Sequence, residues 1–168
     1  MSNWGKVESK YGREVSGLKR LVKPYDYGQK DANLTDKNLR ELLTSELRQV
    51  KTTLSDLLSL AYSETDEAAT SFKRIMNDID LAISEVKTLS YWKFPDDQQP
   101  LEKIFKADVV LLNNIELMKR TLNGIHTQIL SSQAVTSATN SKLENLRKIL
   151  SDTRAVFLER AEIIKIKR

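Results

Sequence analysis

The sequence predicts an all-α protein, an elongated antiparallel bundle of four long helices preceded by a short basic amphipathic N-terminal helix. Apolar residues recur every three or four positions from Leu39 to Ile164, which is the spacing of one helical face. Charged residues make up 30% of the 168 residues and only three residues are proline, a composition typical of helical proteins. The connections expected between the long helices are short, which favours antiparallel neighbours.

The N-terminal segment, residues 1–34, is expected to be distinct from the bundle domain, residues 35–168. Its basic side chains are candidates for docking an anionic surface: Lys6, Lys10, Arg13, Lys19, Arg20 and Lys23. Its apolar side chains share one face of a single helix over residues 2–23 and are candidates for an apolar docking face: Trp4, Val7, Tyr11, Val15, Leu18 and Val22. Each glycine in this stretch weakens the helix by about 1 kcal/mol relative to alanine. We therefore expect it to form only against a cover, which is the bundle, another protein or a membrane interface.

Pro24 ends this helix and a loop follows. The second helix is expected to start near Thr35, whose hydroxyl can act as its N-cap. Its apolar stripe contains Leu39, Leu43, Leu47, Val50, Leu54, Leu57 and Ala61. A break is expected at residues 62–66, where Ser63 or Thr65 can cap the next helix. Because no glycine or proline enforces that break, one continuous helix is the alternative.

The third helix has the stripe Ala69, Phe72, Ile75, Ile79, Ile83, Val86 and Leu89. It is expected to stop before residues 92–100, a segment with two prolines that reads as a loop. Trp92 and Phe94 in this loop are expected to cover the end of the core. Docking of a partner is the alternative role for these two aromatic residues.

The fourth helix is expected over residues 101–130. A Ser/Thr-rich stretch, residues 131–141, then reads as a linker or a frayed helical stretch, and Asn140 or Ser141 is expected to cap the fifth helix. One residue from each long stripe is expected in the core: Leu54, Ile79, Ile115 and Leu146.

Charge is unevenly distributed along the chain, whose net charge is +4. Residues 1–30 hold seven Lys or Arg against three Asp or Glu, whereas residues 52–110 hold six against eleven. From Leu158 onward there are four basic and two acidic residues. Both ends are thus basic and the middle is acidic, which indicates an anionic partner at the ends or head-to-tail association between copies. A solvated surface of uneven charge is the alternative.

The sequence has no pattern typical of catalysis. The absence of cysteine excludes disulfides, thiolate zinc sites and cysteine nucleophiles. His126 is the only histidine, and Asn123 stands where a di-iron bundle would have glutamate. Phosphate-binding loops and nucleophile elbows are also absent. We therefore expect a protein that is not an enzyme, with no cofactor, no metal and no small-molecule substrate.

A short amphipathic helix followed by long antiparallel helices resembles the order in N-BAR and ESCRT-III proteins. The start of the chain, Met-Ser-Asn-Trp-Gly-Lys at residues 1–6, is similar to the starts of such proteins. The chain is shorter than either family, and it lacks the acidic C-terminal tail of ESCRT-III. The resemblance implies a membrane-remodelling scaffold, and no functional residue is carried over from it.

These observations predict a helical assembly or scaffold protein that associates with itself in a homo-oligomer or larger assembly, or packs with partner helices. Its basic N-terminal segment would dock an anionic membrane or protein surface. The alternative is a nucleic-acid-binding structural subunit, similar in type to small subunits of RNA-guided complexes or helical coat proteins. In that alternative, bases would stack on Trp4, Tyr11, Tyr25 and Tyr27. No apolar run approaches the ~20 residues of a membrane span, and the N-terminus does not read as a secretory signal. A cytoplasmic protein is expected, with or without membrane association.

Overall fold

The structure is a computed structural model that describes residues 1–28, 30–60, 66–88, 93–132 and 135–165. These residues form six helices and no strand, so the predicted all-helical class is confirmed. The helices are α1 (Asn3–Lys10), α2 (Gly12–Leu21), α3 (Ala32–Leu60), α4 (Asp66–Thr88), α5 (Gln98–Ser132) and α6 (Ser137–Lys165).

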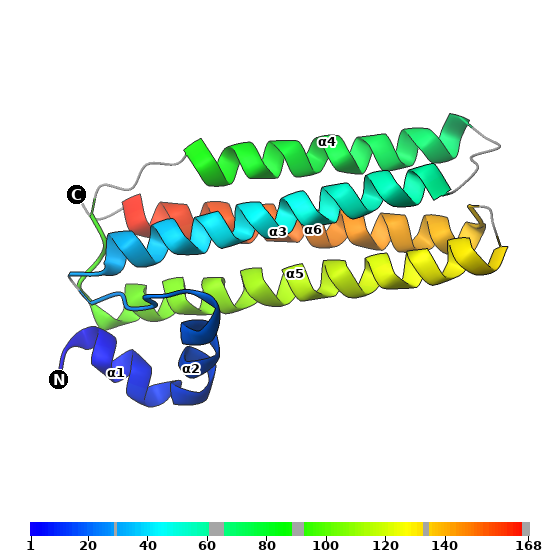
Figure 1. Cartoon of the computed structure of the whole chain (residues 1–168). Coiled ribbons are helices and arrows are strands. Elements are labelled where there is room, and N and C mark those ends of the chain that lie inside the picture. Colours follow the sequence, from blue (N-terminus) through cyan, green and yellow to red (C-terminus); the bar gives the residue numbers. More distant parts are fainter. Residues whose placement is uncertain (29, 61–65, 89–92, 133–134, 166–168) are drawn as a thin grey trace.

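The four long helices lie side by side along the length of the molecule, and α1 and α2 lie against one side of them near one end (Figure 1). Helix α3 packs mainly against α4 and α5, and α6 packs mainly against the same two helices. Helices α3 and α5 run in one direction, and α4 and α6 run in the opposite direction (Figure 1). Each long helix is therefore antiparallel to the next one in the chain, while the packed pair α3 and α5 is parallel.

The core runs between the long helices and is built from their apolar stripes. The residues predicted to be buried, one from each long helix, are all buried: Leu54, Ile79, Ile115 and Leu146. The three-four periodicity therefore identified the inner face of each helix. Burial of these stripes, rather than intrinsic helix propensity, supplies most of the stability of such long helices.

The N-terminal segment forms two short helices, so the expected single helix over residues 2–23 is wrong. The side chain of Ser2 caps α1 by accepting the N–H of Gly5 at 3.0 Å. The helix ends at Tyr11, whose φ of −121° and ψ of 34° lie outside the helical region. Gly12 follows and favours continuation of the helix only weakly. The chain turns at this point, and α2 lies at an angle to α1 (Figure 1).

Helix α3 begins at Ala32, earlier than expected, and Thr35 is not its N-cap. The Thr35 hydroxyl accepts a hydrogen bond from the backbone N–H of Asp26 at 2.9 Å. It donates one to the backbone oxygen of the same residue, also at 2.9 Å. It also lies 3.3 Å from the oxygen of Pro24. Thr35 therefore fastens the preceding loop to the first turns of α3.

Helix α6 begins at Ser137, before the expected caps Asn140 and Ser141. Of the two readings of residues 131–141, the helical one holds for residues 131–132 and 137–141. The cap is a reciprocal pair of threonines. The N–H of Thr139 donates to the Thr136 hydroxyl at 3.3 Å, and the N–H of Thr136 donates to the Thr139 hydroxyl at 3.4 Å. This arrangement has the geometry of a capping box, with threonine in place of the usual glutamate or glutamine.

Helix α4 begins at Asp66, in agreement with the expected break before it, whereas residues 61–65 lie outside the described residues. In the loop before α5, Phe94 is buried and its ring lies 5.5 Å from that of Tyr27. Phe94 therefore covers the end of the core as predicted. Trp92, for which the same role was predicted, lies outside the described residues.

Candidate functional site

A buried arginine joins three of the long helices near the end where α1 lies. Arg160 of α6 donates from Nε to Oδ1 of Asp108 on α5 at 2.5 Å, and from Nη1 to Oδ1 of Asp36 on α3 at 2.7 Å. Its Nη2 donates to the hydroxyl of Tyr27 at 2.6 Å. Asp36 also accepts from Nε of Arg40 at 2.8 Å. The planar guanidinium thus satisfies two carboxylates and a phenol at once.

Two loop tyrosines complete this buried cluster. The hydroxyls of Tyr25 and Tyr27 donate to Oδ2 of Asp108 at 2.8 and 2.7 Å. Burial raises the pKa of both phenols well above the ordinary value, so both remain protonated and keep donating. Burial also raises the pKa of Asp108, and Arg160 with the two hydroxyls acts in the opposite direction. Because the side chains of Arg160 and Asp108 have no exposed surface, the cluster holds the loop and helices together rather than offering a site to solutes.

An aromatic cluster connects α1 to the same place. The ring of Trp4 meets Tyr25 and Tyr27 edge-on, at 5.9 and 5.5 Å between ring centroids. Trp4 is buried, and its Nε1 has no hydrogen-bond partner among the described residues. The base-stacking role considered for Trp4, Tyr25 and Tyr27 would therefore require these rings to leave the core. Tyr11, the fourth candidate, is half-buried against Phe105.

The predicted apolar docking face is covered by the protein itself. Five of its members are buried and Tyr11 is half-buried, the five being Trp4, Val7, Val15, Leu18 and Val22. Helix α1 packs against α5. The sequence left open whether this face packs against the bundle, another protein or a membrane. In the structure it packs against the bundle. In this conformation the face is occupied by the protein's own core, and its role as a docking face for a membrane or a partner stays a prediction.

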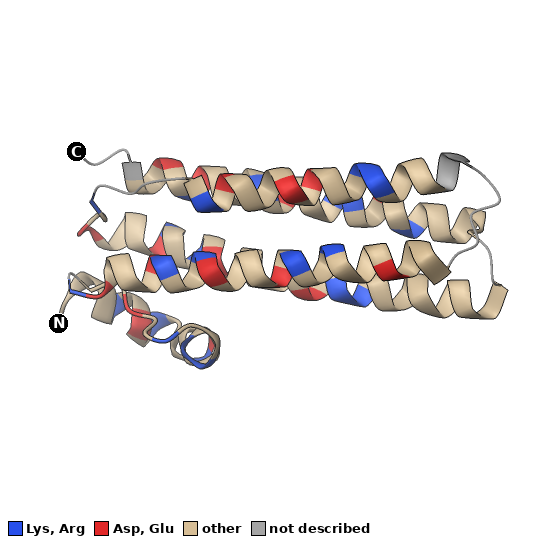
Figure 2. Ribbon diagram, turned by 45° about the horizontal axis from the view of Figure 1, so that its top comes forward, with Lys and Arg blue, Asp and Glu red and all other residues tan. Residues whose placement is uncertain are grey.

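The six basic candidates are all exposed, and two of them form ion pairs within the N-terminal region or with α5. Lys10 pairs with Glu102 at 3.1 Å, and Lys19 pairs with Glu8 at 2.6 Å. Elsewhere, Lys and Arg alternate with Asp and Glu along the long helices (Figure 2). The positive charge of the N-terminal segment is thus partly neutralised by the fold.

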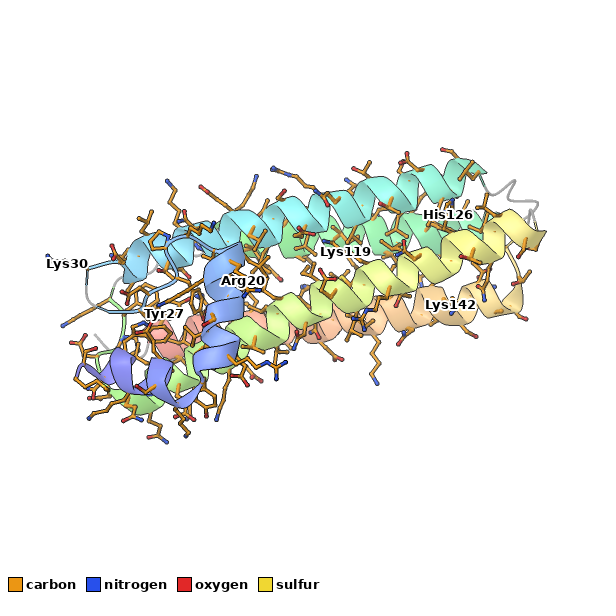
Figure 3. The ribbon with its side chains drawn as sticks, turned by 60° about the horizontal axis from the view of Figure 1, so that its bottom comes forward. Arg20, Tyr27, Lys30, Lys119, His126 and Lys142 are labelled. Atoms are coloured by element: carbon orange, nitrogen blue, oxygen red, sulfur yellow. The ribbon has the colours of Figure 1, made fainter. Side chains whose placement is uncertain are left out.

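The other four basic candidates have no carboxylate of a described residue within ion-pair distance. Arg13, Arg20 and Lys23 form no ion pair with a described residue, and Lys6 approaches only the neutral Asn3, at 3.4 Å. Arg13 and Arg20 lie on α2, where Figure 3 labels Arg20, and Lys23 follows directly. These three cations, together with Lys6, are the exposed positive groups that a bound anionic surface could contact.

Glu102 is the charged centre of the contact between α1 and α5, and sequence analysis did not single it out. It accepts hydrogen bonds from the Tyr11 hydroxyl, from Lys106 at 2.9 Å and from Lys10 at 3.1 Å. These hydrogen bonds, that from Tyr11 first, lower the pKa of Glu102 from 4.5 to about 2. The carboxylate therefore stays ionised over most of the pH range.

This lowered pKa predicts a pH-dependent effect of Glu102→Gln. Since the folded pKa lies below the unfolded value, ionisation of Glu102 stabilises the fold above about pH 4.5, and this contribution is lost as the pH falls toward 2. Glu102→Gln should lower the Tm at pH 7 and have a much smaller effect near pH 2. Thermal unfolding followed by circular dichroism between pH 7 and pH 2 measures this, with the exposed Glu144→Gln as control. An equal Tm difference at both ends of the range would contradict it.

A groove of about 370 Å³ opens beside α2, between α3 and α5. Its lining is mainly apolar, and it includes three carboxylates, those of Glu14, Glu46 and Glu116. No sequence pattern pointed to this groove, because its lining comes from three separate helices, α2, α3 and α5.

The single histidine of the sequence, His126, was the remaining candidate for catalysis or metal binding. His126 is exposed and lies far from Tyr27, toward the opposite end of the long helices (Figure 3). The described residues contain no group of three or more His, Asp or Glu side chains able to hold a metal ion. Within the same residues, no helix is long and apolar enough to cross a bilayer. No family model, curated protein or solved structure was found to match the chain.

Proposed function

We propose that the protein is a non-catalytic helical assembly protein, in which the elongated antiparallel bundle acts as a scaffold and the α1–α2 region docks an anionic membrane surface. The observation that carries this proposal is the set of exposed cations without ion-pair partners on and just after α2: Arg13, Arg20 and Lys23. They project from a segment whose side chains Val15, Leu18 and Val22 are already packed inside the protein. The positive groups are therefore held in place before any partner arrives.

Docking of this kind would be mainly electrostatic. Each Lys or Arg close to an anionic bilayer contributes about 1 kcal/mol. Leu21 lies next to Arg20 and is 60% exposed, so it can add an apolar contact at the level of the headgroups. The buried side of α2 stays on the bundle in this mode. It differs from the interfacial helix expected from the sequence, in which the buried side would enter the membrane.

The test uses the variant Arg13→Glu/Arg20→Glu/Lys23→Glu and liposomes that contain phosphatidylserine. Reversal of three charges should weaken binding in co-sedimentation by about a hundredfold or more. The matched control is Lys73→Glu/Arg74→Glu/Lys87→Glu, which makes the same change in net charge on exposed residues of α4. Helix α4 lies on the opposite side of the bundle from α2 (Figure 1).

Two outcomes would contradict membrane docking. The first is equal loss of binding in both triple variants, because that would show only a dependence on net charge. The second is salt-dependent binding of single-stranded RNA with no binding of liposomes, which would favour the nucleic-acid alternative. Added salt should weaken liposome binding, since exposed charges are screened over about 10 Å at 0.1 M salt.

A further inference from the structure

Helix α2 covers the seam between α3 and α5 only in part, and the apolar groove lies where this cover stops. Figure 3 shows α2 crossing near α3 and α5, with Lys119 farther along the same seam. Leu18 and Leu21 come from α2, Leu42 from α3, and Val109 and Leu112 from α5. Leu21 is exposed, and Leu42 and Val109 are half-buried. The groove is therefore an apolar surface that these helices leave open.

The charged side chains that line the groove are all carboxylates. Each of its three helices contributes one carboxylate: Glu14 from α2, Glu46 from α3 and Glu116 from α5. Lys119 pairs with Glu46 and lies 3.6 Å from Glu116, so one ammonium group offsets only part of this charge. Glu14 forms no ion pair with a described residue. An occupant with positive groups beside an apolar surface would match this arrangement.

Gly17 gives an independent reason to regard the open groove as useful. It lies inside α2 and lines the groove. It does not have a positive φ, and a Cβ at this position would meet no atom within 4 Å. Neither the backbone nor the packing therefore requires glycine, although glycine inside a helix costs about 1 kcal/mol relative to alanine. What glycine does here is leave space in the groove.

We propose that this groove binds an amphipathic helix of a partner protein, which inserts a few apolar side chains and places Lys or Arg beside Glu14, Glu46 and Glu116. A helix fits because helices that bind grooves present apolar residues at three-four spacing, and here two long helices with α2 beside them form the walls. The basic flanks follow from the three carboxylates. The groove does not include the exposed cations that are proposed to dock a membrane, although both involve α2 and Leu21 borders both.

The experiment measures fluorescence anisotropy of labelled helical peptides with the full chain. The probes are alanine-rich peptides of about four turns, with leucines at three-four spacing in several registers and lysine flanks. A second set carries glutamate in place of lysine. The lysine set should bind about tenfold tighter or more than the glutamate set, and added salt should reduce this difference.

A pair of glycine variants tests the place of binding without relying on loss of structure. Gly17→Leu puts a side chain into the groove and should weaken binding of the lysine peptides by about tenfold or more, while its Tm stays at or above that of the wild type. Gly12→Leu is the matched control, because its Cβ also starts in open space but Gly12 does not line the groove. It should bind the peptides like the wild type. Liposome binding should be the same in both variants.

Four results would overturn the proposal. These are no binding of any lysine peptide, equal binding of the lysine and glutamate sets, and unchanged binding in Gly17→Leu. The fourth is a dimer seen by light scattering that Gly17→Leu dissociates, since this would assign the groove to a second copy of the chain. Failure of the liposome experiment would leave these results unaffected, so the two proposals are tested separately.

Discussion

Arg160→Ala is expected to lower the free energy of unfolding by about 3–5 kcal/mol, because it removes one partner from a buried ionic network. Asp108 would lose the guanidinium that donates to it at 2.5 Å, and Tyr27 would lose a donor at 2.6 Å. Asp36 would keep Arg40 but lose the shorter contact, at 2.7 Å. A buried carboxylate without a counter-charge is costly. Urea denaturation followed by circular dichroism measures the loss.

A surface ion pair provides the control for this prediction. Arg147 lies 3.5 Å from Asp78, with the two side chains 43% and 32% exposed, so Arg147→Ala should cost about 0–1 kcal/mol. A loss in Arg160→Ala that is as small as this would contradict the importance of the buried network. The loss of unfolding free energy in Arg160→Lys should lie between the losses in Arg160→Ala and Arg147→Ala. A single ammonium group keeps the charge but cannot make the several hydrogen bonds of the planar guanidinium.

A double-mutant cycle separates the ionic network from the loss of packing. Arg160→Met combined with Asp108→Asn removes both charges and keeps much of the volume. The combined loss should be smaller than the sum of the two single losses, since neither charge is then left alone in the core. Simple additivity would show that the two side chains do not act as a pair.

The positions of the long helices could be predicted because core packing repeats the same pattern over many turns. Leu54, Ile79, Ile115 and Leu146 are buried as expected. Helix ends were predicted less well, because they depend on one or two hydrogen bonds. Several Ser and Thr residues near each end could supply such a bond, and Thr136 does so where Asn140 or Ser141 was expected.

The buried network could be recognised in the sequence only in part. Arg160 lies three residues after Phe157 and four before Ile164, which is a position of the apolar stripe. A charged residue at such a position indicates a buried partner. Its partners, however, are 52 and 124 residues away in the sequence, at Asp108 and Asp36. Periodicity within one helix carries no information about which helices lie opposite it.

The apolar face of the N-terminal segment was predicted correctly. Which surface buries this face could not be predicted from the sequence. A helix with one apolar face is stabilised equally by a bundle, a partner or a membrane, so the pattern alone does not distinguish them. The break at Tyr11 was also hidden, because residues before and after it keep the three-four spacing. In the structure the hydroxyl of Tyr11 donates to Glu102, and the helices on either side turn their apolar residues toward the protein core.

Trp4→Ala is expected to lower the free energy of unfolding by about 3–5 kcal/mol, the usual cost of truncating a large buried aromatic residue. Trp4 is only 3% exposed and packs edge-on against Tyr25 and Tyr27, so its loss leaves a cavity beside the tyrosines that hold Asp108. The expected result is a lower urea midpoint together with faster tryptic cleavage between Lys10 and Lys23. Leu130→Ala, at a residue of α5 that is 59% exposed, is the control and should change neither measurement.

Trp4→Phe shows whether the loss comes from packing or from the indole N–H. Phenylalanine keeps an aromatic ring between the two tyrosines and removes the buried Nε1, which has no hydrogen-bond partner among the described residues. Because such a donor costs about 1–3 kcal/mol, Trp4→Phe should lose much less stability than Trp4→Ala. If Trp4→Ala instead speeds cleavage within α1 and α2 while the urea midpoint stays unchanged, the N-terminal helices are separable from the bundle. That result would restore the detachable docking segment predicted from the sequence. A shift in both measurements would establish α1 and α2 as part of the cooperative core, and it would restrict docking to their exposed cations.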